Sequence, residues 1–505
     1  MRFILPFLLA SSALAQVGPN YERPASDVPA RYKGAVTWRE GRPSDHLSKG
    51  DWWRVFKDAK LNELMARATA NNQQLKAAIA RFDQARAAAR MARSDFFPVL
   101  TAPLTAERQR TAQNMPSAFP LNGASYDGPA YNALLDFSWE IDLWGKIRRQ
   151  VEGSRADAAA AADAMHNVLL GIQADVATNY FKLCELDEEM RLVRAAVGFR
   201  REAFNIAKGR VAAGAGSELE QAQSETEVAT AEAETSSLQA QRDQLENAIA
   251  ILLGVSPSNF RIAPDRGLPS PPSVPTGMPS DLLERRPDVS QAERKLASAT
   301  AGIGVARAYY FPSISLLGRG GFQSGDIDLL LEPTSLMWSY GPSVNVPIFA
   351  GNKNRFNLDR ARSVHDEALA GYRQALLGAL GDVENSLSAL RNLSTQAAAQ
   401  QRARESAERA SSLAKTRYEA GTSLYLDVID ANRTVLATQR ATAQVAGQRL
   451  VASIALIKAL GGGWDQSQTA TLPAVSPDPA ARSVPEGEKS GFFSKVKGLF
   501  KRREK

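Results

Sequence analysis

The chain has 505 residues, with 61 Lys and Arg against 54 Asp and Glu, which gives a formal net charge of +7. Hydrophobic residues make up 44% and charged residues 23%, so the chain can bury a core and is not disordered as a whole. The single cysteine, Cys184, excludes an intrachain disulfide framework and any site built from several cysteines. The three histidines lie far apart and no nucleophile–base pattern appears. The sequence therefore predicts no metal site, no cofactor and no enzyme activity.

The first residues have the pattern of a secretory signal peptide. One Arg and an apolar run, Phe3–Leu9, precede Ala13 and Ala15, and cleavage is predicted after Ala15. A buried N-terminal helix is the alternative. No later stretch reaches the roughly 18 apolar residues that a membrane-spanning helix needs, so a closed β-barrel is the remaining way across a membrane.

Two long windows without proline predict very long helices. Both windows are rich in Ala, Gln, Glu and Arg, and they cover residues 130–256 and 348–472. The candidate helices run from Gly145 to Gly214 and from Gly351 to Gly421. At about 1.5 Å per residue, each would be on the order of 100 Å long, which predicts coiled-coil-like packing.

Matching motifs indicate a tandem duplication. GRVAAGAGSELEQA (209–222) aligns with TRYEAGTSLYLDVIDA (416–431), and the Phe-Pro pair at 97–98 aligns with the pair at 311–312. The repeat length of about 210 residues is too long for a solenoid, so we expect two similar halves.

Each half also carries two segments in which apolar and polar residues alternate, and these predict β-strands. The segments are residues 96–106, 131–143, 311–322 and 336–348, with polar loops at 107–130 and 323–334. A period of two with aromatic residues along one face is typical of transmembrane barrel strands, although a half-buried sheet in a soluble domain is the alternative. Four strands cannot close a barrel, so several protomers would have to share one.

At these residues the chain resembles the outer-membrane efflux channel family, of TolC, OprM and NodT type, over about residues 17–464. VGPNYERP (17–24) resembles the N-terminal signature of the lipoprotein branch, and DWWRVFKDAKLNEL (51–64) resembles its first helix. LLERRPDVSQAER (282–294), followed by IGVARAYYFPSISL (303–316), is the most specific stretch. GTSLYLDVIDA (421–431) resembles the periplasmic tip.

The resemblance implies a mainly α protein with a membrane β-barrel. Three identical chains would share one 12-stranded barrel, with four strands from each tandem-duplicated protomer. Their long, coiled-coil-like helices would form a periplasmic α-barrel. The implied location is the outer membrane of a Gram-negative bacterium, in contact with its lipid and extending into the periplasm.

The resemblance and the patterns together predict a domain organisation. In chain order it comprises a signal peptide (1–15), an N-terminal periplasmic segment with the first helices (16–95), the first β-hairpin (96–145), the long helices of the first repeat (146–260), a Pro-rich linker (261–279), a second-repeat helix (280–310), the second β-hairpin (311–350), the long helices of the second repeat (351–464) and a flexible basic tail (465–505).

The implied function is that of an exit duct in a tripartite efflux pump. The duct would passively conduct small molecules or drugs after a periplasmic membrane-fusion adaptor and an inner-membrane transporter, of RND or ABC type, open it. The alternatives are the outer-membrane component of a type I protein secretion system, a periplasmic coiled-coil adaptor and a soluble helical enzyme. No feature indicates a nucleic-acid partner.

The chain departs from the lipoprotein branch at one position. The lipid-bearing Cys of that branch lies three residues before the Gly-Pro of the signature, where this chain has Ala15. No lipid anchor is therefore expected, and the barrel must hold the protein in the membrane. Cys184 is predicted to be a small packing residue within a long helix.

The predicted tip contains a candidate ion-selective constriction. Asp427 and Asp430 are three residues apart, so on a helix they project from one face. In a threefold trimer they would form two stacked rings of carboxylates, which favour cations in a narrow pore. The alternative for Asp427 is a helix cap.

The resemblance also places gate and contact residues at the tip. Tyr418 and Glu220 match the positions of a Tyr and an acidic residue that link helices in the closed gate, and the Arg partner of that network falls at Ser423. A weaker lock, or one held by another residue, is therefore expected. The surface offered to the adaptor would comprise Gly214, Ser217, Gly421 and Thr422, although a helix-ending Gly is also expected for local reasons.

Most of the net charge lies at the C-terminus. From Lys489 onward there are seven basic residues and one acid, so this segment carries +6 of the total. Apolar residues at 492, 493, 496, 499 and 500 recur at helical spacing, which is typical of an amphipathic lipid anchor. A disordered, solubilising end is the alternative.

Overall fold

The computed structural model describes residues 16–25, 33, 51–110, 127–264, 267–272 and 286–462. The chain divides into two units, Met1–Trp464 and Asp465–Lys505, and every described residue belongs to the first. The predicted signal peptide (1–15), Ala15 at its end and the basic tail (465–505) lie outside the described residues.

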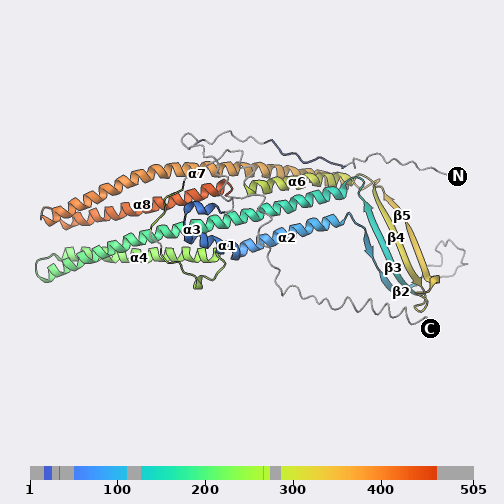
Figure 1. Cartoon of the computed structure of the whole chain (residues 1–505), viewed down its shortest axis with the longest axis horizontal. Helices are drawn as coiled ribbons and strands as arrows, with labels where there is room; N and C mark the ends of the chain where they lie inside the picture. Colours follow the sequence, from blue (N-terminus) through green and yellow to red (C-terminus); the bar gives the residue numbers. More distant parts are fainter. Residues whose placement is uncertain are drawn as a thin grey trace. The chain divides into compact units, whose positions relative to one another are not determined.

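Most of the described chain is helical (Figure 1). The helical elements are η1 (Trp52–Phe56), α1 (Ala59–Asn71), α2 (Gln73–Ser94), α3 (Lys146–Ala212), α4 (Glu218–Leu252), η2 (Pro257–Asn259), α6 (Pro287–Ala308), η4 (Pro333–Ser335), α7 (Lys353–Glu419) and α8 (Tyr425–Ala459). Both α3 and α7 are single helices of 67 residues, as predicted. Among the described residues, no helix has the length and apolarity required to cross a membrane.

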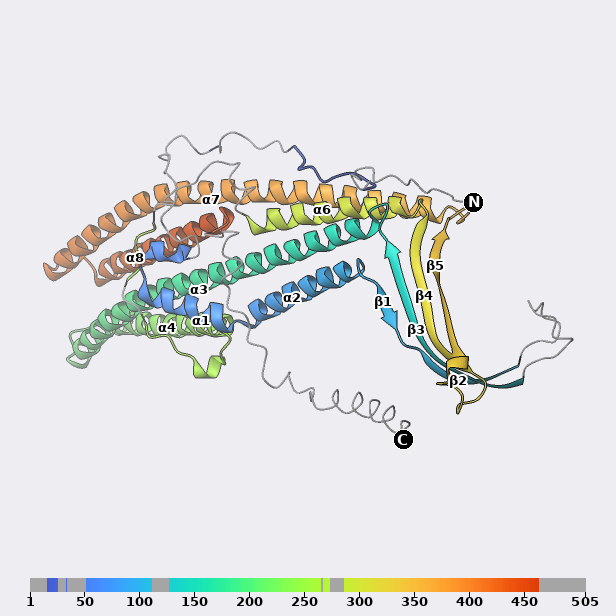
Figure 2. The same ribbon diagram turned by 45° about the vertical axis from the view of Figure 1, so that its right-hand side comes forward.

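The predicted duplication is confirmed by the positions of the helices. Both ends of α7 lie 207 residues after the corresponding ends of α3, and α8 has the same offset from α4. The two copies also pack alike, since each long helix contacts the shorter helix that follows it. In Figures 1 and 2 the two helix pairs run side by side away from the strands.

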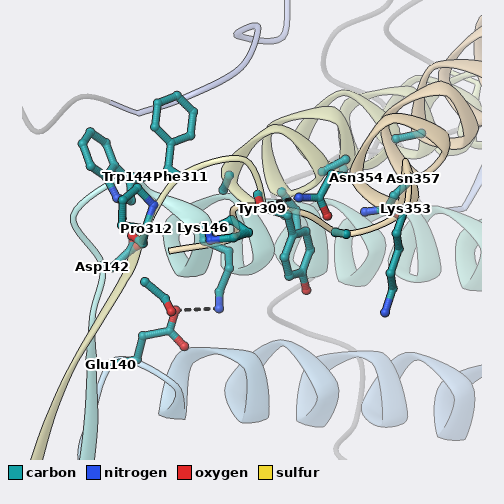
Figure 3. Close-up of a pocket in the computed structure, with 18 of the residues that line it drawn as sticks. Glu140, Asp142, Trp144, Lys146, Tyr309, Phe311, Pro312, Lys353, Asn354 and Asn357 are labelled. Atoms are coloured by element: carbon teal, nitrogen blue, oxygen red, sulfur yellow. Dashed lines mark hydrogen bonds and ion pairs between the residues drawn. The ribbon is translucent and has the colours of Figure 1, made fainter. Parts of the chain in front are cut away.

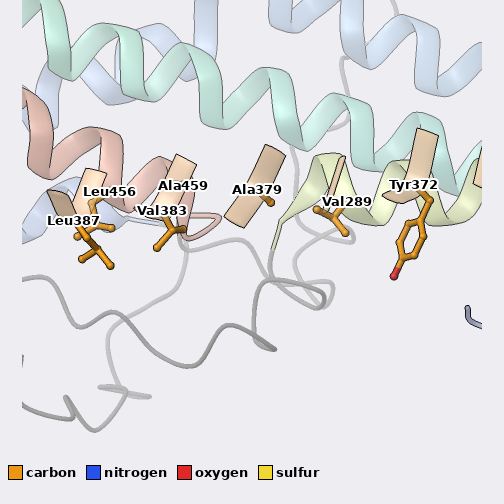
Figure 4. Close-up of a cluster of buried hydrophobic side chains, with 7 residues drawn as sticks. All are labelled: Val289, Tyr372, Ala379, Val383, Leu387, Leu456 and Ala459. Carbon is orange, nitrogen blue, oxygen red and sulfur yellow. The ribbon is translucent and has the colours of Figure 1, made fainter. Parts of the chain in front are cut away.

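Helix α3 joins the two halves. It packs on α2 and α4 of its own half and also on α6 and α8 of the other, whereas α7 packs on α6 and α8. A hydrophobic cluster fixes the second half (Figure 4), and its members are Val289, Tyr372, Ala379, Val383, Leu387, Leu456 and Ala459. The four members on α7 recur at seven- and four-residue intervals, which places them on one face of the helix.

The strands form one antiparallel sheet beside the helices (Figure 2). They are β1 (Val99–Thr101), β2 (Leu104–Arg110), β3 (Asp127–Ile141), β4 (Ser313–Ser324) and β5 (Leu336–Asn345). Both β1 and β2 pair with β3, so they occupy one strand position that is interrupted before Pro103, which has no N–H to donate. The sheet order is therefore β1/β2, β3, β4, β5.

The first predicted loop is shorter than expected. The sequence predicts this loop at residues 107–130, but pairing in the first hairpin continues to Arg110 opposite Asp127. The polar residues at the end of β2 resemble a loop in sequence, yet they satisfy their backbone groups through this ladder.

The predicted alternation gives the sheet two different faces. On the apolar face, Trp139 lies beside Leu316, which lies beside Pro342, and Trp338 and Tyr340 of β5 are 69% and 80% exposed. On the polar face, Arg319 Nε donates to Asp136 Oδ1 at 2.6 Å across β3 and β4. Exposed aromatic side chains on one whole face of a sheet require an apolar surrounding or partner.

The N-terminal segment 16–25 binds across α3 and α6. Arg149, buried on α3, donates to the carbonyl oxygens of Val17 and Gly18 at 3.3 Å each. Arg23 forms two hydrogen bonds of 2.9 and 2.8 Å with Glu293 of α6. Gly304 makes the close approach possible, because a Cβ there would lie 2.8 Å from both the Val17 oxygen and Arg149 Cγ.

We predict that Gly304→Ala destabilises the fold by about 1–3 kcal/mol through overpacking against this segment. Gly302→Ala on the same helix is the control, because its Cβ would meet no atom within 4 Å. The free energy of unfolding of the control should be unchanged or higher by up to about 1 kcal/mol, since Ala favours a helix. Helix melting followed by circular dichroism measures both. Equal melting midpoints for the two variants would contradict the close approach.

A half-buried carboxylate lies between α3 and α8. Glu185 packs directly against Gly447, where any Cβ would overlap its carboxylate. Burial raises the pKa of Glu185 to about 7, the neighbouring Glu189 adds to the effect, and Lys182 opposes it. The charged form is thus disfavoured in the folded protein.

The unfolding free energy should therefore fall as pH rises from about 4.5, the ordinary pKa of Glu185, to about 7, its folded value. Because Gln is neutral at every pH, the unfolding free energy of Glu185→Gln should not show this decline with pH. The variant should have a higher melting temperature than the unsubstituted protein at pH 8. Glu188→Gln, which removes a carboxylate paired with Arg191 on the same helix, is the control. Parallel melting curves for Glu185→Gln and the unsubstituted protein at pH 5 and pH 8 would refute this assignment.

Candidate functional site

The two turns that join the long helices to their partners have the same backbone geometry. After α3, the N–H of Ala215 donates to Arg210 O and that of Gly214 to Val211 O. After α7, Thr422 and Gly421 repeat these bonds. Both glycines have positive φ, 70° and 73°, so each turn is a Schellman C-cap that requires glycine. The backbone geometry of the turns therefore explains the glycines at 214 and 421 by itself.

The N-terminal ends of α4 and α8 differ. The hydroxyl of Ser217 accepts from Leu219 N at 3.2 Å and caps α4. The residue in the same place before α8 is Leu424, which has no side-chain acceptor. Asp427 is the third residue of α8 and does not cap it, but a carboxylate in the first turn still favours the helix dipole.

Tyr418 links the ends of the two long helices. Arg210, at the end of α3, donates from Nη1 to the Tyr418 hydroxyl at 3.1 Å. The Tyr418 ring also packs on Tyr425 of α8, with 5.3 Å between the ring centroids. Burial raises the pKa of the Tyr425 hydroxyl, and the nearby Tyr418 and Glu220 add to the effect.

The expected partners of Tyr418 are not joined to it within the protomer. The Ser423 hydroxyl is buried without a hydrogen-bond partner, and no hydrogen bond among the described residues connects Tyr418 to Glu220. Position 423, where the resemblance expects an Arg, is Ser, and the arginine that bonds to Tyr418 within the protomer is Arg210, which approaches from the other half. Sequence alignment of the two turns could not show this, because it does not tell which helix ends meet.

Asp430 belongs to a chain of charges that crosses three helices. Arg433 of α8 pairs with Asp430 at 3.2 Å and also with Glu227 of α4, and Arg200 of α3 lies 3.5 Å from the other oxygen of Glu227. The hydrogen bond from Arg433 holds the pKa of Glu227 below its ordinary value, although burial opposes this. Asp427 is exposed, and no ion pair joins it to another described side chain.

A second set of contacts lies one heptad further from the turns. Arg440, seven residues after Arg433, pairs with Glu234 of α4, seven residues after Glu227, and with Glu189 of α3 at 3.2 Å. We call the contacts of Arg433 and Arg440 with α3 and α4 the arginine ladder. In sequence these charges resemble an ordinary helix surface. The seven-residue spacing of these charges in both halves was the signal in the sequence that could have indicated the contacts.

No group of three or more metal-ligating side chains is gathered within the described part of the chain. Cys184 is a buried residue of α3, beside Leu183 in the core.

Paired long helices with turns at one end and a two-faced sheet at the other define a channel-type protomer. The family model "Outer membrane efflux protein" matches residues 64–255 and 278–462. The chain therefore belongs to the outer membrane efflux protein family, and it is an outer-membrane exit channel of efflux systems in a Gram-negative bacterium that extends into the periplasm.

Individual relatives agree with this assignment. The chain is 32% identical to outer membrane protein OprJ of Pseudomonas aeruginosa, over 90% of this chain and 94% of OprJ. It is 34% identical to the pyoverdine export outer membrane protein OpmQ of the same species, over 84% of this chain and 90% of OpmQ. The solved structure of the outer-membrane channel OprN matches with a TM-score of 0.81 at 31% identity, over 89% of this chain and all of OprN. All three relatives are outer-membrane proteins, and OprN is a channel.

We predict that Arg433→Gln/Arg440→Gln loosens α8 from α3 and α4. Amide hydrogen exchange in the first turns of α8 should become faster, by about two- to tenfold at pH 7, because exposed or half-buried ion pairs contribute modestly. Lys415→Gln is the control, because its pair with Glu419 lies within α7. Unchanged exchange in the double variant would contradict a restraining role for the ladder.

The difference between the double variant and the unsubstituted protein should also depend on pH. Because the folded pKa of Glu227 lies below its ordinary value of 4.5, the contribution of this carboxylate is complete above about pH 4.5. It is lost as pH falls through the lower folded value, so the exchange rates of the two proteins should converge in acid.

Proposed function

We propose that three copies of this chain form a passive duct that crosses the outer membrane and the periplasm. The observation that carries the proposal is the two-faced sheet. Its outer strand positions, β1/β2 and β5, have no partner on one side within the described residues of a protomer. Such edges favour pairing with another chain, and a shared barrel would satisfy them.

In the proposed barrel, the apolar face with Trp139, Trp338 and Tyr340 contacts lipid. The polar face, with the Asp136–Arg319 pair, lines the aqueous interior. Four strand positions from each of three protomers would give the 12-stranded barrel. In this proposal, the apolar face is the part of the described chain that contacts the membrane.

The turns between the long helices are the proposed periplasmic entrance. Rings of Asp427 and Asp430 around a threefold axis would favour cations. The two rings differ, because Arg433 partly neutralises Asp430 whereas Asp427 has no such partner among the described residues. We therefore assign the larger share of the selectivity to Asp427.

Opening the proposed entrance requires α8 to move relative to α3 and α4. That movement breaks the arginine ladder and the bond from Arg210 to Tyr418, without any covalent chemistry. A periplasmic adaptor and an inner-membrane transporter would drive it. The adaptor would contact the two turns at Gly214, Ser217, Gly421 and Thr422, where the backbone is exposed at the end of the helices.

Single-channel recording in planar bilayers tests this function. The purified protein should insert as a trimer and conduct with a preference for cations. Asp427→Asn should lower the cation-to-anion permeability ratio by about twofold or more, and Asp430→Asn by less. Glu63→Gln, an exposed carboxylate on α1, is the control with unchanged selectivity.

One result would overturn the duct, and another would overturn only the carboxylate rings. A protein that never conducts, even with the ladder removed by Arg433→Gln/Arg440→Gln, is not a duct. If Asp427→Asn/Asp430→Asn conducts with unchanged selectivity, the carboxylate rings do not determine the cation preference. The assignment of a duct would still stand.

A further inference from the structure

A large hollow lies where the long helices meet the strands (Figure 3). It has a volume of about 1080 Å³, and its wall comes from α3, α6, α7 and the nearby ends of β3, β4 and β5. Of the four strand residues in this wall, Glu140, Ser313 and Asn345 belong to the polar face of the sheet, and Ile141 belongs to the apolar face. A volume of this size accommodates a drug-sized organic molecule.

Two helix faces create the hollow. On α6, Ser298, Gly302 and Val305 share one face, and Tyr309, the C-cap residue of that helix, continues it at an interval of four. A Cβ added at Gly302 would meet no atom within 4 Å, which shows that the small residues leave real space. On α7, the facing residues are Lys353, Asn357, Arg360 and Val364.

The charges in the wall do not balance. Glu140 is paired with Lys146 at 2.5 Å, as Figure 3 shows. Asp142 accepts from Arg148 Nε at 3.2 Å and from two backbone N–H groups at the start of α3. Both carboxylates in the wall are therefore already compensated.

Two cations remain. Among the described residues, neither Lys353 nor Arg360 has an ion-pair partner, and the Arg360 guanidinium donates only to the amide oxygen of Asn357, at 3.2 Å. Uncompensated cations in a concave wall attract an anion.

The rest of the wall is largely apolar. Tyr309 is 48% exposed, and the stacked rings of Trp144 and Phe311 lie 4.9 Å apart. Val305 and Val364 add aliphatic surface. The wall thus combines the cations Lys353 and Arg360 with aromatic and aliphatic side chains, which suits a molecule that has both an anionic and an apolar part.

We infer that this hollow is a binding site for amphiphilic organic anions. The anionic group lies between Lys353 and Arg360, and the apolar body lies against Tyr309, Val305 and Val364. The inference rests on the proposed function, because the hollow opens on the polar face of the sheet, which lines the duct in that proposal. Solutes of this class would then bind at the junction of helices and strands as they pass through the duct.

The test measures binding directly and not transport. The full-length trimer in lipid nanodiscs is titrated with 8-anilinonaphthalene-1-sulfonate, an aromatic sulfonate, and the signal of protein-free nanodiscs is subtracted. Gly302→Leu fills the hollow from α6 and should weaken binding at least about tenfold. Lys353→Gln/Arg360→Gln should weaken it about fivefold and reduce its salt dependence, because two partly exposed charges are lost.

Gly371→Leu is the matched control, because Gly371 also has open space around its Cβ but lies outside the hollow. Unchanged affinity in Gly302→Leu, or equal binding of a naphthyl trimethylammonium cation, would overturn the site. Loss of the trimer in Gly302→Leu alone would show that a neighbouring protomer occupies the hollow, which also overturns it. Conductance of the same preparations is recorded separately, so a failure of the duct itself is distinguishable from a failure of this site.

Discussion

The packing of α3 against helices of both halves is the constraint on which the rest of the protomer depends. A helix of 67 residues cannot bury its surface against one partner, and α3 contacts α2, α4, α6 and α8 along its length. Gly447 lets α8 approach so closely that the Glu185 carboxylate packs on its backbone. At the strand end of the same helix, buried Arg149 holds the N-terminal segment. One helix therefore positions the sheet, the N-terminal segment and the turns at the far end.

The sequence was sufficient for features that depend on local chemistry. The helix ends follow from Gly214 and Gly421, because a left-handed turn residue is required there and glycine provides it. The strand faces follow from strict alternation, as the position of Trp139 shows. The arginine ladder could not be predicted, because Arg433 and Glu227 lie 206 residues apart and only the packing of α3 between their helices brings them together. For the same reason, Arg210 was not recognised as the partner of Tyr418.

The polar contacts at the two ends of the helices differ in kind. Near the strands, Arg149 is almost fully buried and donates to the backbone oxygens of Val17 and Gly18 and to the side chains of Asn20 and Glu152, so its removal would leave several acceptors unsatisfied. Near the turns, Arg433 is 53% exposed and water can replace its contact with Glu227, because the buried Glu227 keeps Arg200 as a second partner. The strand end is thus built to stay fixed, whereas the end with the turns is built from contacts that can be replaced.

This contrast bears on how the proposed duct could open. Arg433 and Arg440 are partly exposed but Glu227 and Glu189 are buried, so each pair contributes more than the about 0.2–1 kcal/mol of a fully exposed pair, and the arginine ladder and the Arg210–Tyr418 bond together hold α8 by a few kcal/mol. A partner that binds the open arrangement about 10²- to 10³-fold more tightly supplies a comparable free energy, because each factor of ten corresponds to about 1.4 kcal/mol. A hydrophobic seam of the kind that joins α6, α7 and α8 would demand far more for the same movement. Charged contacts at the turns therefore let a docking partner open the channel while the buried seam keeps the second half intact.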